Sequence, residues 1–141
     1  METADVRKRV VDTIERAKRS AQERRARTDL ENKAFGVFLE RLAVPLCRQV
    51  AGALKAAGHP FAVNTPEGAV RVVSERTAED YIELTLDTAG EDLWVVGRTR
   101  RSWGRRVIES ERPVRRCAVR ESTEEDLLSF LLQELEPFLI R

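Results

Sequence analysis

The chain has 141 residues, of which 42% are hydrophobic and 35% charged, with a formal net charge of +1. This length and apolar content predict a single domain, 1–141, whose core needs neither a disulfide framework nor a structural metal. No apolar run approaches the roughly 18 residues of a membrane span, and the charged start lacks the apolar stretch of a secretory signal. Composition therefore argues against a membrane-spanning or exported protein and against a membrane partner.

The two cysteines indicate a reducing compartment. Cys47 and Cys117 lack the C-x-x-C spacing of redox or zinc sites and lie among apolar neighbours. Such cysteines are predicted to be buried, reduced thiols. We therefore expect a cytoplasmic location.

The small net charge conceals a strong segregation of charge along the chain. Residues 1–28 carry +4, residues 29–93 carry −5, residues 94–120 carry +7 and residues 121–141 carry −5. A field divided in this way favours either an anionic partner on the basic blocks or the pairing of opposite surfaces between subunits.

Residues 1–28 are predicted to form a charged helix that extends from an α+β core formed by residues 29–141. Its apolar residues recur at steps of four, three and four, which is the spacing of one helix face. This narrow stripe suits a helix that lies on a neighbour or pairs with a second copy in a short coiled coil. The predicted contact seam consists of Val10, Ile14, Ala17 and Ala21.

A second helical segment should begin at a capping box. Thr28 and Glu31 have the spacing of that motif, so we expect the helix to break and restart there. Pro45 predicts a kink or a division near Leu42, and Gly58 with the following His-Pro predicts the end of the helix. The apolar face of this main core helix is Phe35, Phe38, Leu39, Leu42, Leu46, Val50 and Leu54.

After Pro60 the apolar period changes from about 3.6 to 2, which indicates strands joined by short loops. The expected strands are 61–64, 69–74, 81–87, 93–100 and 105–111, with 114–119 as a further edge strand. A second capping box at 122–125 should open a final helix that Pro137 ends. Its apolar face is Leu127, Leu128, Leu131, Leu132, Leu135 and Leu139. The predicted fold is α+β: N-terminal helices, an antiparallel meander of about four to six strands and a C-terminal helix, with the helices on one sheet face.

The basic segment 98–107 has two readings. Guanidinium groups and an aromatic ring are what sequence-tolerant nucleic-acid binding needs, which makes this segment a candidate anion or nucleic-acid site. The structural alternative is a hairpin with a positive φ at Gly104, a tryptophan packed on the adjacent strand, and arginines paired with Glu109 and Glu111. Because strand side chains alternate, Arg98, Arg100 and Arg106 are expected on one side, opposite Arg101 and Arg105. The candidate residues are Arg98, Arg100, Arg101, Trp103, Arg105 and Arg106.

Signals for catalysis are weak. His59 is the only histidine and has no recognisable nucleophile beside it, and no nucleotide-binding or hydrolase motif is present. The acidic residues of 80–92 are expected to be scattered and solvated rather than to hold a metal. Apolar residues that could line a ligand cavity between sheet and helices are those that an ordinary core requires. We predict no catalytic residue, metal ligand or cofactor.

These observations rank three functions. The first is a non-enzymatic protein-interaction or self-associating module, with a homodimer as the expected assembly and another protein as the alternative partner. The second is nucleic-acid binding through the hairpin at 98–107. The third is small-ligand binding or an enzyme whose reaction the sequence does not identify.

Overall fold

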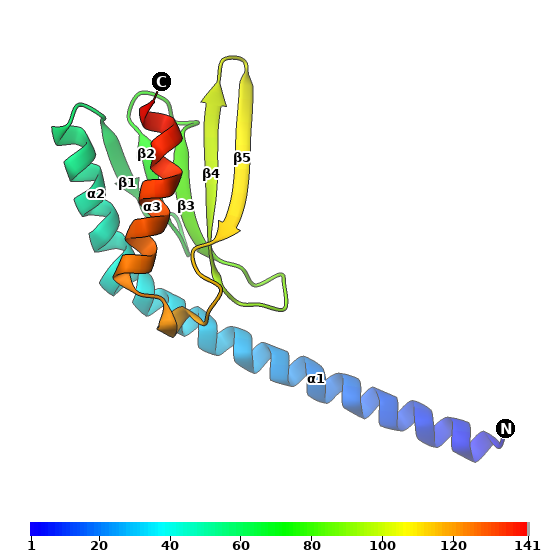
Figure 1. Cartoon of the computed structure of the whole chain (residues 1–141). Coiled ribbons are helices and arrows are strands. Elements are labelled where there is room, and N and C mark those ends of the chain that lie inside the picture. Colours follow the sequence, from blue (N-terminus) through cyan, green and yellow to red (C-terminus); the bar gives the residue numbers. More distant parts are fainter. Residues whose placement is uncertain (141) are drawn as a thin grey trace.

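The computed structural model describes residues 1–140 and confirms the predicted α+β layout (Figure 1). Two helices, α1 (Thr3–Phe38) and α2 (Val44–Ala56), are joined by a π-helical turn, η1 (Leu39–Ala43). The strands are β1 (Phe61–Asn64), β2 (Val70–Ser74), β3 (Tyr81–Leu86), β4 (Val95–Trp103) and β5 (Arg106–Pro113). A 3-10 turn, η2 (Val119–Glu121), precedes the last helix, α3 (Glu124–Leu139).

The sheet is a meander in which each strand pairs antiparallel with the next, in the order β1-β2-β3-β4-β5. The alternation in β3 sets its orientation: Ile82 and Leu84 are buried, whereas Tyr81 and Glu83, which alternate with them, lie on the other face. The prediction of a further strand over 114–119 is wrong. Val114 donates one more hydrogen bond to Val95, after which the chain turns, because the amide of Cys117 bonds locally to the carbonyl of Arg115.

The core lies between one face of the sheet and the two helices α2 and α3, which both cover that face (Figure 1). Gly97 of β4 decides how closely α3 approaches, because a Cβ built on it would lie 2.1 Å from Cζ of Phe130. The absence of a side chain at Gly97 thus seats the Phe130 ring directly on the strand. The apolar residues of the core include Phe35, Phe38, Leu46, Val50, Val70, Val72, Leu127 and Leu131.

The predicted break at 28–31 does not occur, since α1 runs unbroken through these residues. In a continuous helix the amides at Thr28 and Glu31 already have intrahelical partners, so a capping box has nothing to satisfy. Glu31 instead accepts a hydrogen bond from the amide of Val119, 3.1 Å away, and ties α1 to the segment before α3.

The predicted division near Leu42 is confirmed as η1. Pro45 has no amide hydrogen to donate to the carbonyl of Arg41, and the wider π turn adjusts the backbone just before it. The amide of Val44 bonds to the carbonyl of Leu39, five residues back. The predicted stop is also confirmed, because Gly58 has a φ of +91° after the last turn of α2.

At α3 the capping box lies one residue later than predicted. Thr123 is the N-cap: its hydroxyl accepts from the amide of Asp126, and the Asp126 carboxylate accepts from the amide of Thr123. Pro137 does not end the helix, which continues to Leu139. The continued helix lacks one backbone hydrogen bond but buries Phe138. The rings of Phe138 and Phe61 pack edge to face, with their centroids 6.1 Å apart.

Both cysteines are free thiols, but only one prediction of burial is correct. Cys47 is fully buried, and burial raises the pKa of its thiol to about 12. Cys117 is half-buried, because it lies in the irregular segment after β5, where its sulfur is 3.6 Å from the hydroxyl of Ser122.

Candidate functional site

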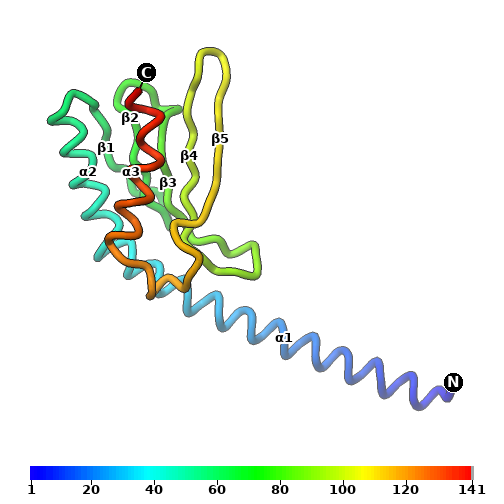
Figure 2. Tube along the Cα trace, in the orientation of Figure 1, coloured from blue at the N-terminus to red at the C-terminus, as the bar shows by residue number. Residues whose placement is uncertain are grey.

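The first 27 residues stand away from the rest of the molecule. Every side chain of residues 1–27 is exposed, and this part of α1 projects from the sheet and the other helices (Figures 1 and 2). At 1.5 Å per residue, residues 3–27 extend for roughly 37 Å. We call residues 3–27 the arm.

The arm carries the predicted seam on one face. Val10 and Ile14 are 51% and 47% exposed, and Ala17 and Ala21 lie on the same face in the following turns. Val6, 44% exposed, extends the stripe by one turn towards the N-terminus. Sequence reasoning omitted Val6, although it lies four residues before Val10 on the same helical spacing. The five residues together form a continuous, narrow apolar stripe.

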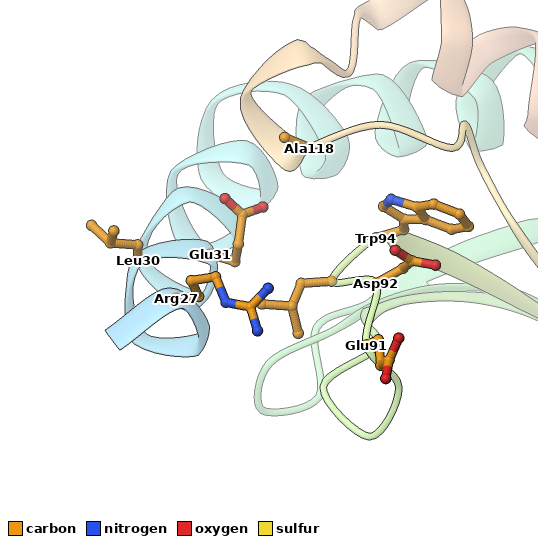
Figure 3. Close-up of a pocket in the computed structure, with 8 residues that line it drawn as sticks. Arg27, Leu30, Glu31, Glu91, Asp92, Trp94 and Ala118 are labelled. Carbon is orange, nitrogen blue, oxygen red and sulfur yellow. The ribbon is translucent and has the colours of Figure 1, made fainter. Parts of the chain in front are cut away.

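The base of the arm is braced by the connection between β3 and β4. The guanidinium of Arg24 donates to the carbonyl oxygens of Ala89 and Gly90, at 3.4 and 3.0 Å. Beside this contact is a hollow of about 270 Å³ between the helix and the connection (Figure 3). Its lining residues are Arg27, Leu30, Glu31, Glu91, Asp92, Leu93, Trp94 and Ala118. These contacts set the direction in which the arm leaves the core.

On the outer face of the hairpin β4-β5, the arginines are paired with acidic residues. Arg98 lies opposite Glu111, and a guanidinium nitrogen is 3.6 Å from its carboxylate. Arg100 contacts Glu109 at 3.7 Å and Glu79 at 3.0 Å. The structure therefore supports the structural alternative for these two arginines, whose charge is offset locally.

The opposite face of the hairpin differs. The guanidinium carbon of Arg101 lies 5.3 Å from the centre of the Trp103 ring, which is 53% exposed instead of packed on the neighbouring strand. Arg106 pairs with Trp103 and shares this face, so its predicted placement beside Arg98 and Arg100 is wrong. Arg105 is exposed in the turn next to Gly104, whose φ is +62° as expected. The five arginines are thus split between two faces.

The remaining candidate features are structural. Asp80 is buried, so the expectation that it is solvated is wrong; it accepts hydrogen bonds from the amide and hydroxyl of Ser102, which secures β4 near the hairpin end. Glu83 pairs with Arg71 at 2.6 Å on the outer sheet face. Across residues 1–140, no group of three or more His, Cys, Asp or Glu residues is placed to hold a metal ion. Of the apolar residues considered for a ligand cavity, Phe35, Phe38, Leu42, Ile82 and Leu84 are packed in or against the core, whereas Trp94 lines the hollow at the base of the arm.

Of the helices in the described residues, none is both long and apolar enough to cross a membrane. Comparison with protein-family models, with curated proteins and with solved structures finds no match for this chain.

Proposed function

We propose that the protein is a self-associating module, with a homodimer as its basic assembly and the arm as its contact element. The observation that carries the proposal is the apolar stripe of the arm, exposed on a helix that projects from the core. Its central residues, Val10 and Ile14, are each about half exposed.

The physics of isolated helices supports a partner. In proteins, most of the stability of a helix comes from tertiary packing of its amphipathic face. The arm packs no side chain into the core of its own chain, since all of its residues are exposed. Association through the stripe would supply the packing and remove the exposed valines and isoleucine from water.

The proposal places the protein in the cytoplasm. Both cysteines are free, and the pKa of about 12 for Cys47 keeps its thiol protonated at neutral pH. Free thiols are the ordinary state in a reducing compartment. Assaying the protein under reducing conditions is therefore the appropriate choice for the experiments below.

The test is light scattering coupled to size exclusion over a range of protein concentrations. We expect a mass that rises to that of a dimer for the unaltered chain, and a monomer for Ile14→Asp, which puts a charge in the stripe. Val37→Asp is the matched control, because Val37 is another half-exposed β-branched residue of α1 but lies outside the arm. A monomer at every concentration would overturn the proposal, as would equal dissociation of both variants.

A second candidate function is nucleic-acid binding by the turn of the hairpin β4-β5 and by its face opposite Arg98 and Arg100. It is favoured by one observation: Arg101, Trp103, Arg105 and Arg106 cluster there, with Trp103 exposed for stacking. Its test is binding of a labelled single-stranded oligonucleotide at increasing salt, with an Arg101→Ala and Arg105→Ala double variant. Arg98→Ala is the control, because that arginine is already paired with Glu111. Equal binding by the double variant and the unaltered chain would exclude the hairpin.

A further inference from the structure

We infer that the arm of one copy docks in a groove between α2 and α3 of a second copy. This inference rests on the proposed function and names the surface that the stripe meets. The seam alone would suggest that two arms pack against each other. In the inferred arrangement, each of two molecules instead places its arm in the groove of the other.

The groove is apolar and open to solvent. It has a volume of about 550 Å³ and lies between the two helices that cover the sheet. Leu132 on α3 is 55% exposed, so its predicted place in the core face of that helix is wrong. Leu46, Val50 and Leu135 are buried beneath it and form the floor. The other lining residues are Gln49, Ala53, Leu54, Ala57, His59, Leu128 and Leu139.

The arm of the same chain does not reach this groove. α1 continues through η1 into α2, and the arm leaves the molecule on the side away from the free ends of α2 and α3 (Figure 1). Folding back would require α1 to break, and its hydrogen bonding is continuous from Thr3 to Phe38. The occupant must therefore come from another molecule, and a second copy brings its own exposed stripe.

The stripe is long enough to cover the whole groove. From Leu128 to Leu139, α3 lines the groove over roughly 16 Å, and from Val6 to Ala21 the stripe extends over roughly 22 Å. An amphipathic helix that lays its apolar face in a groove between two others is a recurrent mode of recognition. Val6, Val10 and Ile14 are the large side chains of the stripe and would fill the groove, whereas the small Ala17 and Ala21 would cover its end.

Charges beside the stripe and the groove are complementary. On a helical projection, Arg7 and Lys18 border the stripe on one side, eleven residues apart and almost in line. Glu125 and Glu136 border the groove on the outer side of α3, also eleven residues apart. All four side chains are exposed, and none forms an ion pair within residues 1–140. One docked helix can therefore place both basic groups against both carboxylates.

The same charges oppose antiparallel pairing of two arms. Arg7, Lys18 and Arg25 all border the stripe on the same side, and two antiparallel arms packed stripe to stripe bring that side of both helices together. The groove presents carboxylates at that position instead. This difference favours exchange of arms over an antiparallel coiled coil.

The experiment uses two full-length variants with complementary defects. Ile14→Asp disables the arm and leaves the groove intact, whereas Leu132→Asp disables the groove and leaves the arm intact. Each variant alone should have the mass of a monomer. Their equimolar mixture should form a mixed dimer through the one intact arm and the one intact groove. Sedimentation velocity with one variant fluorescently labelled would detect it, at concentrations from about a hundred to about ten thousand times that at which the unaltered protein is half dimeric.

The outcomes separate this inference from the proposed function. A monomeric unaltered protein overturns both. An unaltered dimer with a Leu132→Asp variant that is still dimeric overturns only the groove, as does a mixture that remains monomeric. Formation of the mixed dimer supports the groove and shows that both variants are folded, with Val37→Asp as the substitution that should leave the dimer unchanged.

Discussion

The two parts of α1 have the same backbone but different support. Residues 28–38 bury Phe35 and Phe38, which are 4% and 6% exposed and stack at 5.9 Å. The arm, residues 3–27, buries no side chain. Arg24 at its base donates hydrogen bonds to the carbonyl oxygens of Ala89 and Gly90 in the connection between β3 and β4. One continuous helix is thus held by tertiary packing at one end, while every side chain at its other end is exposed.

The largest difference in the free energy of unfolding should appear between two truncations, one of an apolar side chain in each part of α1. Phe35→Ala should lower the free energy of unfolding by about 3–5 kcal/mol, because it leaves a cavity in the core. Ile14→Ala should change the stability of the monomer by less than about 0.5 kcal/mol, since Ile14 is already in water. Urea denaturation at a concentration that keeps the protein monomeric measures both. Similar losses would mean that the arm is packed within its own chain.

The second prediction tests the close contact that positions α3. Gly97→Ala places a methyl group within 2.1 Å of the Phe130 ring, so the ring or the strand must move. We expect the free energy of unfolding to fall by about 1–3 kcal/mol, the usual cost of overpacking. Thermal and urea unfolding would show it. A change below about 0.5 kcal/mol would mean that the helix and the sheet adjust freely at this point.

A smaller effect of opposite sign should follow the same substitution within α1. A Cβ on Gly36 meets no atom within 4 Å, and the residue is exposed in the helix. Gly36→Ala should therefore raise the free energy of unfolding by about 0.5–1 kcal/mol, because alanine favours the helix and restricts the unfolded chain. Destabilisation would indicate that the helix must bend there.

The smallest effect concerns the two helix starts. α1 begins without a side-chain cap, whereas α3 begins with the capping box of Thr123 and Asp126. The backbone hydrogen bond from Thr123, aided by Arg115, holds the pKa of Asp126 below its ordinary value. A lowered pKa stabilises the fold above the ordinary carboxyl range, and this contribution is lost as the pH falls through the folded-state pKa. Asp126→Asn should slightly lower the Tm at neutral pH.

The control for that prediction is the pH series itself. Because the unaltered carboxylate becomes protonated in acid, the Tm difference between the two proteins should shrink towards zero as the pH falls below about 4. A difference that stays constant in acid would show that the charge of Asp126 contributes nothing.

Local signals predicted five of the six strands to within about three residues, because each depended on adjacent residues, whereas the strand expected over 114–119 is absent. The range Phe61–Asn64 agrees with β1, the alternation in β3 assigns its faces, and Gly58 and Gly104 have the positive φ that their turns require. The segment at 28–31 shows where such signals fail. Thr28 and Glu31 have the spacing of a capping box, but α1 continues through them. Glu31 instead accepts a hydrogen bond from the amide of Val119, in the segment before α3.

The candidate surfaces were predicted only in part. The seam from Val10 to Ala21 follows from helical spacing, and the structure places it on one exposed face. The split of the hairpin arginines needed the register, since Arg106 follows Trp103 and not Arg98. The groove was not predicted from the sequence, because Leu132 belongs to the same helical pattern of leucines as the buried Leu131 and Leu135, although it is itself exposed. Spacing identifies an apolar face but not how much of it a neighbour covers.

The α+β class, the helices before and after an antiparallel meander, and the amphipathic character of the arm could be predicted from periodicity and turn chemistry, which depend on a few adjacent residues. The continuity of α1, the fit of Phe130 on Gly97 and the apolar groove between α2 and α3 could not be predicted in this way. The last two are contacts between segments distant in sequence, and their geometry is set by the packing of whole elements.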